Sequence, residues 1–266
     1  MKPCPASNPM RLFLHPNGTT PDRRETAFQA VETLSRQFDC VIAPENASWL
    51  DISSCKSGGP EDCDMICAIG GDGTILHAAI PALRAGKPLF GINMGHRGYL
   101  CAFNRDELPD LDEQLLSALI PSSRTLLGFS WHGEERFAVN DIIIAKGEFG
   151  TTVTVSAQEG KNTFGQWQGD GIVVATPTGS SGYNASAGGP LLTPDCGCFV
   201  LNPLCPVAHN GNAIIYPDVQ FLSLQAKTRD AQPDAQVYVD GTLLGPLEHA
   251  LNLHKYEKTL TLLIRA

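Results

Sequence analysis

Short apolar runs alternate with segments of helical periodicity along the first 120 residues. The apolar runs predict strands, because a strand that is buried on both faces of a sheet is almost continuously hydrophobic. They lie at residues 11–15, 41–43, 65–69 and 88–92. Helical spacing of apolar side chains predicts one helix that begins with Thr20 and Pro21, one that begins at Thr74, and one over 104–119. Residues 44–60 are polar and rich in turn formers, which predicts a surface loop. The order of these elements favours a Rossmann-like parallel sheet with crossover helices.

The pattern changes at about residue 124 to two-residue alternation, with many Val, Ile, Thr, Phe and Trp side chains between glycine-containing turns. Strands are predicted at 129–132, 137–144, 151–157 and 163–168, and again at 237–239 and 260–264. Short strands at this spacing favour a β-sandwich over another parallel unit. We therefore expect an α/β domain over 1–122 and a β-sandwich domain over 123–249. The last segment, about 250–266, is a candidate to return to the first domain.

Composition and charge limit the classes of partner. The chain has 266 residues, 42% of them hydrophobic, which suits two domains with their own cores. A net charge of −9 argues against a nucleic-acid or anionic-membrane partner, because there is no basic field to attract one. The first residues lack the apolar stretch of a signal peptide and no later run is long enough to span a membrane, so we expect a cytoplasmic protein. The nine cysteines show no pairing of zinc-site motifs, and no protein-held metal is expected.

The segment from 65 to 79 combines an apolar strand, a glycine-rich turn and a helix. Gly70, Gly71 and Gly73 would let backbone N–H groups approach phosphate oxygens, and the helix N-terminus that follows Thr74 adds partial positive charge. Asp72 does not suit a simple anion cradle, because its carboxylate would repel the ligand. It fits a site where it accepts a proton or acts beside a divalent cation. The alternative is that Asp72 only caps the helix.

Two further segments carry candidate chemistry. Asn93 lies in a second glycine-rich segment, at the carboxyl end of a predicted strand, where ligands of open α/β sheets gather. The run from Asp170 to Pro190 places hydroxyls, glycines and Tyr183 directly after an apolar strand. Such side chains can bind a ribose and a base edge while leaving room for a flat ring. The alternative is a Ser/Gly linker.

These motifs, in this order, resemble those of the NAD kinases, the family that phosphorylates the adenosine 2′-hydroxyl of NAD to make NADP. The matching motifs are Gly-Gly-Asp-Gly-Thr at 70–74, Gly-Ile-Asn-Met-Gly at 91–95 with Gly-Tyr-Leu at 98–100, Asn140-Asp141, the run 170–190, and Asp240-Gly241. The glycine loop alone also occurs in lipid kinases and phosphofructokinases. Together with the downstream Thr-Pro-Thr-Gly-Ser at 176–180, it makes the resemblance specific over most of the chain.

The resemblance implies roles for individual residues. Asp72 would activate the 2′-hydroxyl, while Gly70, Gly71, Gly73 and Thr74 would lie against the triphosphate of ATP. The Asn140-Asp141 pair would hold the adenine of NAD and the ribose of its nicotinamide half. Contacts to the dinucleotide are implied for Ser181, Tyr183 and Ser186, and Asp170 would lie at the nicotinamide end, where that contact can come from a neighbouring subunit. Asn93, Thr178, Gly182 and Asp240 complete the predicted binding set.

The resemblance also implies an α/β domain followed by a β-sandwich with the cleft between them, ATP as phosphoryl donor, Mg²⁺ carried by the nucleotide, and a homodimer or homotetramer. Three positions depart from the family pattern, and the missing Arg among them removes one expected anionic contact. Ser-Ser-Gly-Tyr at 180–183 replaces Ser-Thr-Ala-Tyr, Val207-Ala208 replaces His-Ser or His-Thr, and Asn212 replaces an Arg. His77 and His96 are candidates to replace in part the anionic contact of the missing Arg, although either histidine also suits a purely structural role. The alternatives are a dinucleotide-binding sensor without catalysis and a lipid kinase that shares the glycine loop.

Overall fold

The computed structural model describes residues 9–95, 98–148, 150–207, 211–228 and 235–265. The chain divides into two compact units, each of which is described by itself below. Unit 1 comprises Met1–Ser122 together with Leu260–Ala266, and unit 2 comprises Ser123–Thr259. Within the described ranges, no helix has the length and hydropathy needed to cross a membrane.

Unit 1 is an α/β layer structure around a largely parallel sheet. Its strands run in the order β3-β2-β1-β4-β5-β20-β7, with β6 paired to β5. The strands are β1 (Arg11–Pro16), β2 (Asp39–Ile42), β3 (Lys56–Ser57), β4 (Met65–Gly70), β5 (Leu89–Asn93), β6 (Phe103–Asn104), β7 (Ile120–Arg124) and β20 (Leu260–Ile264). The helices are α1 (Pro21–Gln37), α2 (Pro44–Leu50), α3 (Asp72–Ala85), α4 (Glu113–Ser117) and the 3₁₀ helix η1 (Arg105–Asp110). The predicted Rossmann-like arrangement is confirmed.

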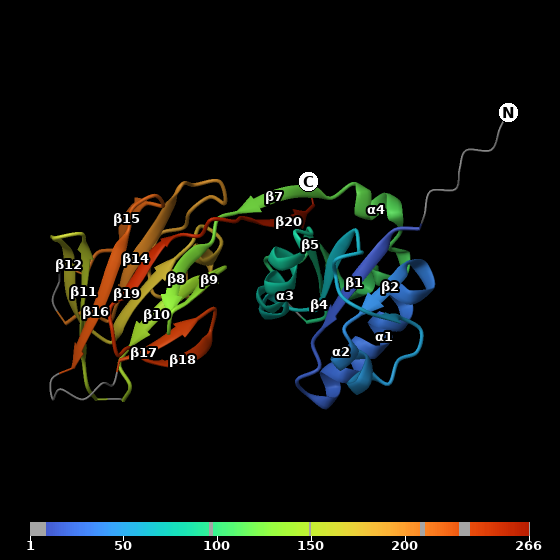
Figure 1. Ribbon diagram of the computed structural model, residues 1–266, viewed down its shortest axis with the longest axis horizontal. Coiled ribbons are helices and arrows are strands. Elements are labelled where there is room, and N and C mark those ends of the chain that lie inside the picture. Colours follow the sequence, from blue (N-terminus) through green and yellow to red (C-terminus); the bar gives the residue numbers. More distant parts are fainter. Residues whose placement is uncertain (1–8, 96–97, 149, 208–210, 229–234, 266) are drawn as a thin grey trace. The chain divides into compact units, whose positions relative to one another are not determined.

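The strand order places a topological switch point between β1 and β4. The chain leaves β1 through α1 to reach β2 on one side, and leaves β4 through α3 to reach β5 on the other. Because such crossovers are almost always right-handed, α1 and α3 cover opposite faces of the sheet, and they flank β1 and β4 in Figure 1. A crevice therefore opens beyond the carboxyl ends of β1 and β4, where open α/β sheets bind their ligands.

Two predictions for unit 1 are wrong. Helix α2 and strand β3 occupy part of the predicted loop 44–60. Pro44 fits the first turn of a helix, where its missing N–H costs nothing, and Leu50 supplies the single buried contact. The predicted helix over 104–119 is broken into η1 and α4, because Pro109 cannot continue an α-helix and Asp112 starts a new one by accepting a hydrogen bond from the backbone N–H of Leu115 at 2.8 Å.

Unit 2 is the predicted β-sandwich. One antiparallel sheet has the order β15-β14-β13-β10-β17-β18 and the other β12-β11-β16-β19-β8-β9. The strands are β8 (Leu127–Trp131), β9 (Glu134–Ala138), β10 (Asp141–Ala145), β11 (Val153–Glu159), β12 (Asn162–Gly169), β13 (Gly171–Ala175), β14 (Cys198–Leu204), β15 (Ile214–Pro217), β16 (Leu222–Thr228), β17 (Gln236–Val239), β18 (Thr242–Pro246) and β19 (Leu251–Lys255). The inward side chains of both sheets form one apolar core that includes Phe129, Trp167 and Phe199.

The predicted strand 137–144 is two strands, β9 and β10, that belong to different sheets. The break falls at Val139 and Asn140, whose backbone N–H groups donate to the carboxylate of Asp240 at 2.9 and 2.7 Å instead of to a neighbouring strand. Asp240 thus takes the place of a ladder partner where the chain changes sheet. After β13 the chain forms the 3₁₀ turn η2 (Gly179–Ser181) and the single-turn helix α5 (Tyr183–Ser186).

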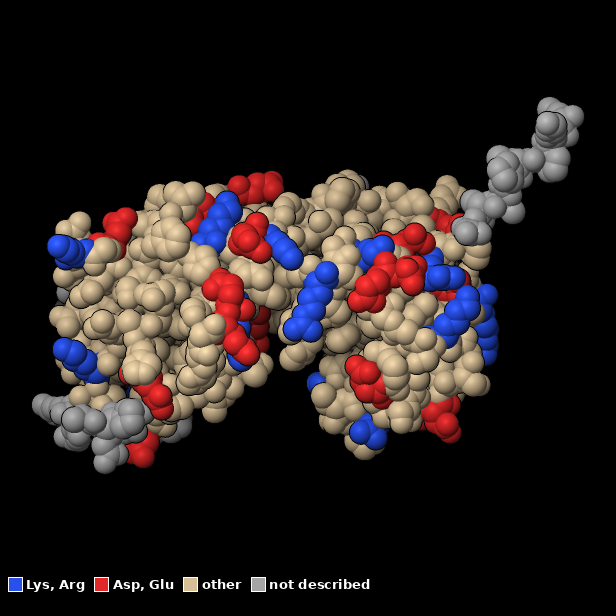
Figure 2. Space-filling view, in the orientation of Figure 1, with Lys and Arg blue, Asp and Glu red and all other residues tan. Residues whose placement is uncertain are grey.

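On the face shown in Figure 2, acidic and basic side chains are interspersed over each unit. The described residues on this face form no extended basic patch, which agrees with the net charge of −9.

Candidate functional site

The glycine-rich turn between β4 and α3 has glycines for two different reasons. A Cβ atom on Gly70 would lie 2.0 Å from the side-chain oxygen of Thr74, so packing inside the protein excludes any larger residue there. A Cβ on Gly71 or Gly73 would meet no atom of the described residues within 4 Å, and neither position has a positive φ. Nothing in the described part of unit 1 requires these two glycines. Their bare backbone faces open space, as a cradle for a ligand would.

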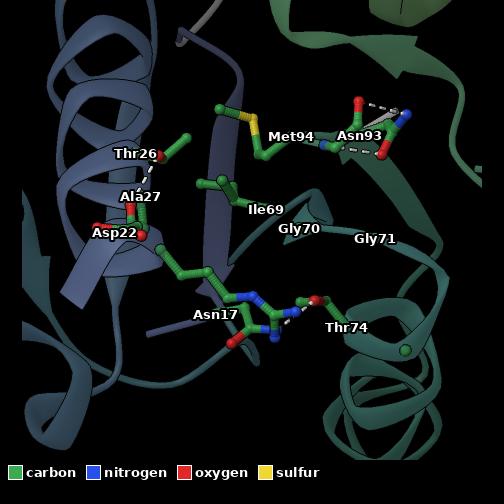
Figure 3. Close-up of a pocket in the computed structure, with 13 residues that line it drawn as sticks. Asn17, Asp22, Thr26, Ala27, Ile69, Gly70, Gly71, Thr74, Asn93 and Met94 are labelled. Carbon is green, nitrogen blue, oxygen red and sulfur yellow. Dashed lines mark hydrogen bonds between the residues drawn. The ribbon is translucent and has the colours of Figure 1, made fainter. Parts of the chain in front are cut away.

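A cavity of about 350 Å³ adjoins this turn at the switch point. Figure 3 shows Asp22, Thr26 and Ala27 of α1 at one wall and Gly70 and Gly71 at the other. The N-terminal turns of both α1 and α3 contribute to the lining. The positive ends of the two helix dipoles therefore make its electrostatics favourable for an anion.

Asn17 and Arg23 are functional candidates that sequence reasoning missed. Asn17 follows β1, and its side-chain amide donates to the Thr74 hydroxyl at 3.2 Å, so it joins the carboxyl end of β1 to the glycine turn. Arg23 lines this cavity and also an adjoining cavity of about 490 Å³ bounded by His15, Trp49 and His77. A basic residue in the first turn of a helix opposes the macrodipole, which is an available sequence signal for an anion-binding role.

The carboxylate of Asp72 holds the second glycine-rich segment. Its Oδ1 accepts hydrogen bonds from the backbone N–H groups of Tyr99 at 3.1 Å and Leu100 at 3.0 Å, and its Oδ2 accepts one from Tyr99 at 3.0 Å. The N-cap of α3 is Gly71, and no side chain caps this helix, so the interpretation of Asp72 as a helix cap is wrong. Among the described residues, only Tyr99 donates to Oδ2, which leaves a lone pair for a further proton.

Asn93, at the end of β5, is buried and shapes the same wall of the cavity. Its Oδ1 accepts from the backbone N–H of Gly95 at 3.1 Å, and its Nδ2 donates to the carbonyl of Gly95 at 3.3 Å and to Asn104 at 3.4 Å. The predicted residues Gly70, Gly71, Gly73, Thr74 and Asn93 thus line one cavity at the switch point, whereas Asp72 is not among its lining residues and its carboxylate is hydrogen-bonded to the backbone at 99–100. His77 is exposed beside the adjoining cavity, and His96 lies outside the described residues.

In unit 2, Asn140, Asp141 and Asp240 meet at one end of β10 and β17. The Asp240 carboxylate accepts from the backbone N–H of Asp141 at 3.2 Å, in addition to the two N–H groups at the strand break. The backbone of Asp240 is left-handed, with φ of 48°, which places its side chain back over the β10 terminus. Burial, and secondarily the charge of Asp240, raises the pKa of Asp141 to about 7. The Asn140 Oδ1 is buried and accepts no hydrogen bond from the described residues, which leaves an acceptor for a ligand.

The loop after β13 packs directly on Asn140. Thr176 donates its N–H to the Asn140 carbonyl at 2.9 Å and its hydroxyl to the Val139 carbonyl at 2.6 Å. A Cβ on Gly179 would lie 2.0 Å from the Asn140 carbonyl oxygen, so only glycine permits this approach. Thr178 is buried in this loop, and the Ser181 hydroxyl donates to its carbonyl at 3.4 Å.

A separate cavity of about 610 Å³ in unit 2 is lined by the predicted residues Asp170, Tyr183 and Ser186. Asp170 forms an ion pair with Lys146 at 2.6 Å, and the ring of Tyr183 is half exposed. Lys146 was missed by sequence reasoning, although it directly follows β10, next to the paired residues Ala145 and Gly171. Of the three departures, Asn212 lines this cavity, Gly182 immediately precedes α5, and Ala208 lies outside the described residues.

Two family models match the chain. That of the ATP-NAD kinase N-terminal domain covers residues 24–120, and that of the ATP-NAD kinase C-terminal domain covers residues 139–255. Among individual proteins, the NAD kinase of Moorella thermoacetica is 33% identical over 242 residues, which are 87% of this chain and 76% of that protein. The NAD kinase of Ruminiclostridium cellulolyticum is 34% identical over 186 residues, 68% of this chain and 65% of that one. The match therefore spans slightly less than two thirds of the Ruminiclostridium protein.

Solved structures show the same fold. A yeast NADH kinase in complex with NADH superposes with a TM-score of 0.78 at 19% identity, covering 98% of this chain and 85% of that one. An NAD kinase from Archaeoglobus fulgidus in complex with ATP gives a TM-score of 0.68 at 22% identity, covering 95% and 92%. By its sequence matches to both domain models and to these relatives, the chain belongs to the NAD kinase family.

Proposed function

We propose that this member of the NAD kinase family transfers the terminal phosphoryl group of ATP to the adenosine 2′-hydroxyl of NAD, with Asp72 as the general base. Membership of the NAD kinase family supports this activity, and the roles of individual residues are part of the same proposal. The main support for this proposal is the cavity at the switch point, which is lined by the N-terminal turns of two helices. Gly71 and Gly73 lie at this cavity, and the packing of the described residues requires glycine at neither position. That arrangement suits a polyphosphate held mainly by backbone amides.

The proposed chemistry requires one proton transfer and charge stabilisation. As the 2′-hydroxyl oxygen attacks the terminal phosphorus and the bond to ADP breaks, Oδ2 of Asp72 accepts the hydroxyl proton. The amides of the turn and the guanidinium of Arg23 stabilise the charge on the phosphoryl oxygens. Mg²⁺ held on the ATP phosphates would neutralise further charge, and the hard carboxylate oxygens of Asp22 at the cavity suit it as a neighbour.

For the dinucleotide we propose the two clusters of unit 2. The Oδ1 of Asn140, which has no hydrogen-bond partner among the described residues, is an acceptor for the amino group of adenine, and Asp141 beside it is an acceptor for ribose hydroxyls. Thr178, Ser181, Gly182 and Asp240 would shape this cluster. The cavity that contains Asp170, Tyr183 and Ser186 offers a half-exposed ring and a hydroxyl for the remaining part of the ligand.

The first experiment is the substitution Asp72→Asn, assayed by ATP-dependent formation of NADP. Asn keeps an oxygen for the N–H groups of Tyr99 and Leu100, so the fold and the segment 98–100 should persist. Loss of a general base should lower kcat by about 10²- to 10⁴-fold. Asp110→Asn, an exposed site in η1, is the matched control and should leave kcat unchanged. A folded Asp72→Asn enzyme with undiminished kcat would remove Asp72 from this role.

The three departures favour a second candidate, a dinucleotide-binding sensor without turnover. Calorimetry with NAD beside the NADP assay separates the two, because a sensor binds NAD and forms no NADP.

The same assay with polyphosphate in place of ATP, and with NADH in place of NAD, defines donor and acceptor. We also propose a homodimer or homotetramer, which light scattering of the purified protein would test.

A further inference from the structure

Two cysteines of unit 1 lie opposite each other at the edge of the sheet, away from the glycine turn. The parallel register of β2 and β3 pairs Val41 with Lys56 and Ile42 with Ser57. Cys40 precedes Val41 and Cys55 precedes Lys56, so the same register brings the two cysteines opposite each other. Paired residues of neighbouring parallel strands are close enough at Cα for a disulfide, which needs roughly 4.4–6.8 Å.

Both side chains point to the same side of the sheet. Cys40 is 4% exposed and belongs to the apolar core under α1, and Cys55 is partly buried against that same core. The hydroxyl of Ser35, on α1, lies 3.1 Å from the sulfur of Cys55. The two thiols therefore meet beneath α1, one enclosed and one reachable from solvent.

The surroundings of Cys55 favour its thiolate. Hydrogen bonding with Cys40, followed by hydrogen bonds from Ser35 and Ser54, lowers the pKa of the Cys55 thiol, against the opposing effects of partial burial and the Glu32 carboxylate. The same pairing and burial raise the pKa of the Cys40 thiol. A lowered thiol pKa beside a second cysteine is the arrangement of a nucleophilic cysteine and its resolving partner.

We propose that Cys55 and Cys40 form a thiol–disulfide exchange site that reacts with low-molecular-weight disulfides, such as oxidised glutathione, and closes to an intramolecular disulfide. The Cys55 thiolate attacks one sulfur of the reagent, a Cys55–glutathione bond forms, and one glutathione leaves as a thiolate that takes up the proton lost by Cys55. Cys40 then gives up its proton and attacks the Cys55 sulfur, and the second glutathione leaves with that proton. Two protein thiols are oxidised and one glutathione disulfide is reduced to two thiols.

The disulfide would tie the segment after α2 to β2. Helix α2 carries Asn46 and Trp49, which line the cavity of about 490 Å³ beside the glycine turn. Cys55 therefore lies a few residues after helix α2, which borders the proposed nucleotide site. The disulfide itself would involve no residue of that site.

The experiment treats the reduced, full-length protein with oxidised glutathione, blocks remaining thiols with iodoacetamide after acid quenching and unfolding, and maps the peptides by mass spectrometry. We expect the Cys40 and Cys55 peptides joined and lighter by two hydrogens, with both alkylatable thiols lost together. Cys205, which is exposed, serves as the internal reference and should carry glutathione only. Recovery of both Cys40 and Cys55 as alkylated thiols while Cys205 carries glutathione would overturn the proposal.

The variant Cys40→Ala supplies the second measurement. Without the resolving thiol, glutathione should remain on Cys55, and the joined peptide should vanish. In Cys55→Ala, the enclosed Cys40 should be recovered unmodified. If Cys40→Ala fails to fold, the peptide map of the wild-type protein still decides, because it shows the Cys40–Cys55 link or shows both as free thiols. Failure of this site leaves the NADP assay unaffected, so it is distinguishable from failure of the proposed kinase activity.

Discussion

At the scale of single residues, unit 2 contains two carboxylates in contrasting environments. Asp240 accepts hydrogen bonds from three backbone N–H groups, while Asp141 is 5% exposed and has its pKa raised to about 7 by burial and by the charge of Asp240. Neither environment is visible in the Asn-Asp and Asp-Gly dipeptides themselves. The resemblance indicated that these residues matter, but only the fold shows that they are neighbours 99 positions apart in the chain.

The raised pKa of Asp141 predicts a pH-dependent stability of unit 2. Between pH 3.8, the ordinary value for an aspartate, and about pH 7, the folded protein keeps a proton on Asp141 that the unfolded chain has released. Its contribution to the free energy of unfolding is therefore fully present below that window and is lost as the pH rises through it, by up to about 4 kcal/mol at 1.36 kcal/mol per pKa unit. Asp141→Asn cannot ionise, so its stability relative to wild type should increase from pH 5 to pH 8.

Urea unfolding at several pH values, followed by the fluorescence of Trp131 and Trp167 in the unit 2 core, measures this difference. Glu159→Gln, an exposed acid in β11, is the matched control and should show no such trend. Asp240→Asn should lower the pKa of Asp141 by removing the neighbouring charge and so shift the window downward. A difference between Asp141→Asn and wild type that stays constant with pH would contradict the environment described here.

At the scale of an element, the turn between β4 and α3 contains one glycine that packing requires and two that have open space beside them. Gly70 is fixed by Thr74, whereas Gly71 and Gly73 have open space above them. The sequence predicted the strand, the turn and the helix from hydrophobic periodicity, and predicted the turn as a phosphate cradle from its glycines. It could not distinguish a glycine required by a neighbouring side chain from one left bare for a ligand, because that needs the positions of Thr74 and Asn17.

Substitutions of Gly70 and Gly73 by Ala should therefore change the free energy of unfolding in opposite directions. Gly70→Ala should lower the free energy of unfolding by about 1–3 kcal/mol, because the added methyl group overlaps Thr74. Gly73→Ala lies within α3 and should raise it by about 0.5–1 kcal/mol, the helix propensity of Ala over Gly. The same Gly73→Ala should raise the KM for ATP about tenfold or more, equivalent to about 1.4 kcal/mol of lost binding.

Chemical unfolding and steady-state kinetics on both variants test this. A Gly73→Ala enzyme with unchanged KM for ATP would show that the open space above the turn is not the triphosphate site. A fully stable Gly70→Ala protein would show that Thr74 can move aside.

At the scale of the whole molecule, one strand of unit 1 comes after the whole of unit 2 in the chain. The segment Leu260–Ala266 returns to unit 1, where β20 lies between β5 and β7, and its side chains Leu260 and Leu262 are each 1% exposed. Unit 2 is formed by one continuous stretch of chain with its own core. The sequence indicated a return of the C-terminal segment, but its place in the strand order depends on pairing between residues far apart, which no local pattern specifies.

This connectivity predicts different fates for two fragments. The fragment 123–259 should unfold cooperatively in urea on its own, because its core lies entirely within it. The fragment 1–122 should be less stable than the same unit in the full chain by several kcal/mol, because removal of β20 leaves strand edges unpaired and exposes the apolar surface that Leu260 and Leu262 covered. Circular dichroism during urea titration measures both. A fragment 1–122 as stable as unit 1 in the intact protein would show that β20 contributes little.

The course of the element β20 also matters during synthesis of the protein. A ribosome releases the N-terminal residues first, and domains made early usually fold first. Here the strand that lies between β5 and β7 in the first sheet follows the whole of unit 2 in the chain. The β-sandwich can therefore fold while unit 1 still lacks this strand, so unit 1 should become protease-resistant only after unit 2 and β20 have been synthesised.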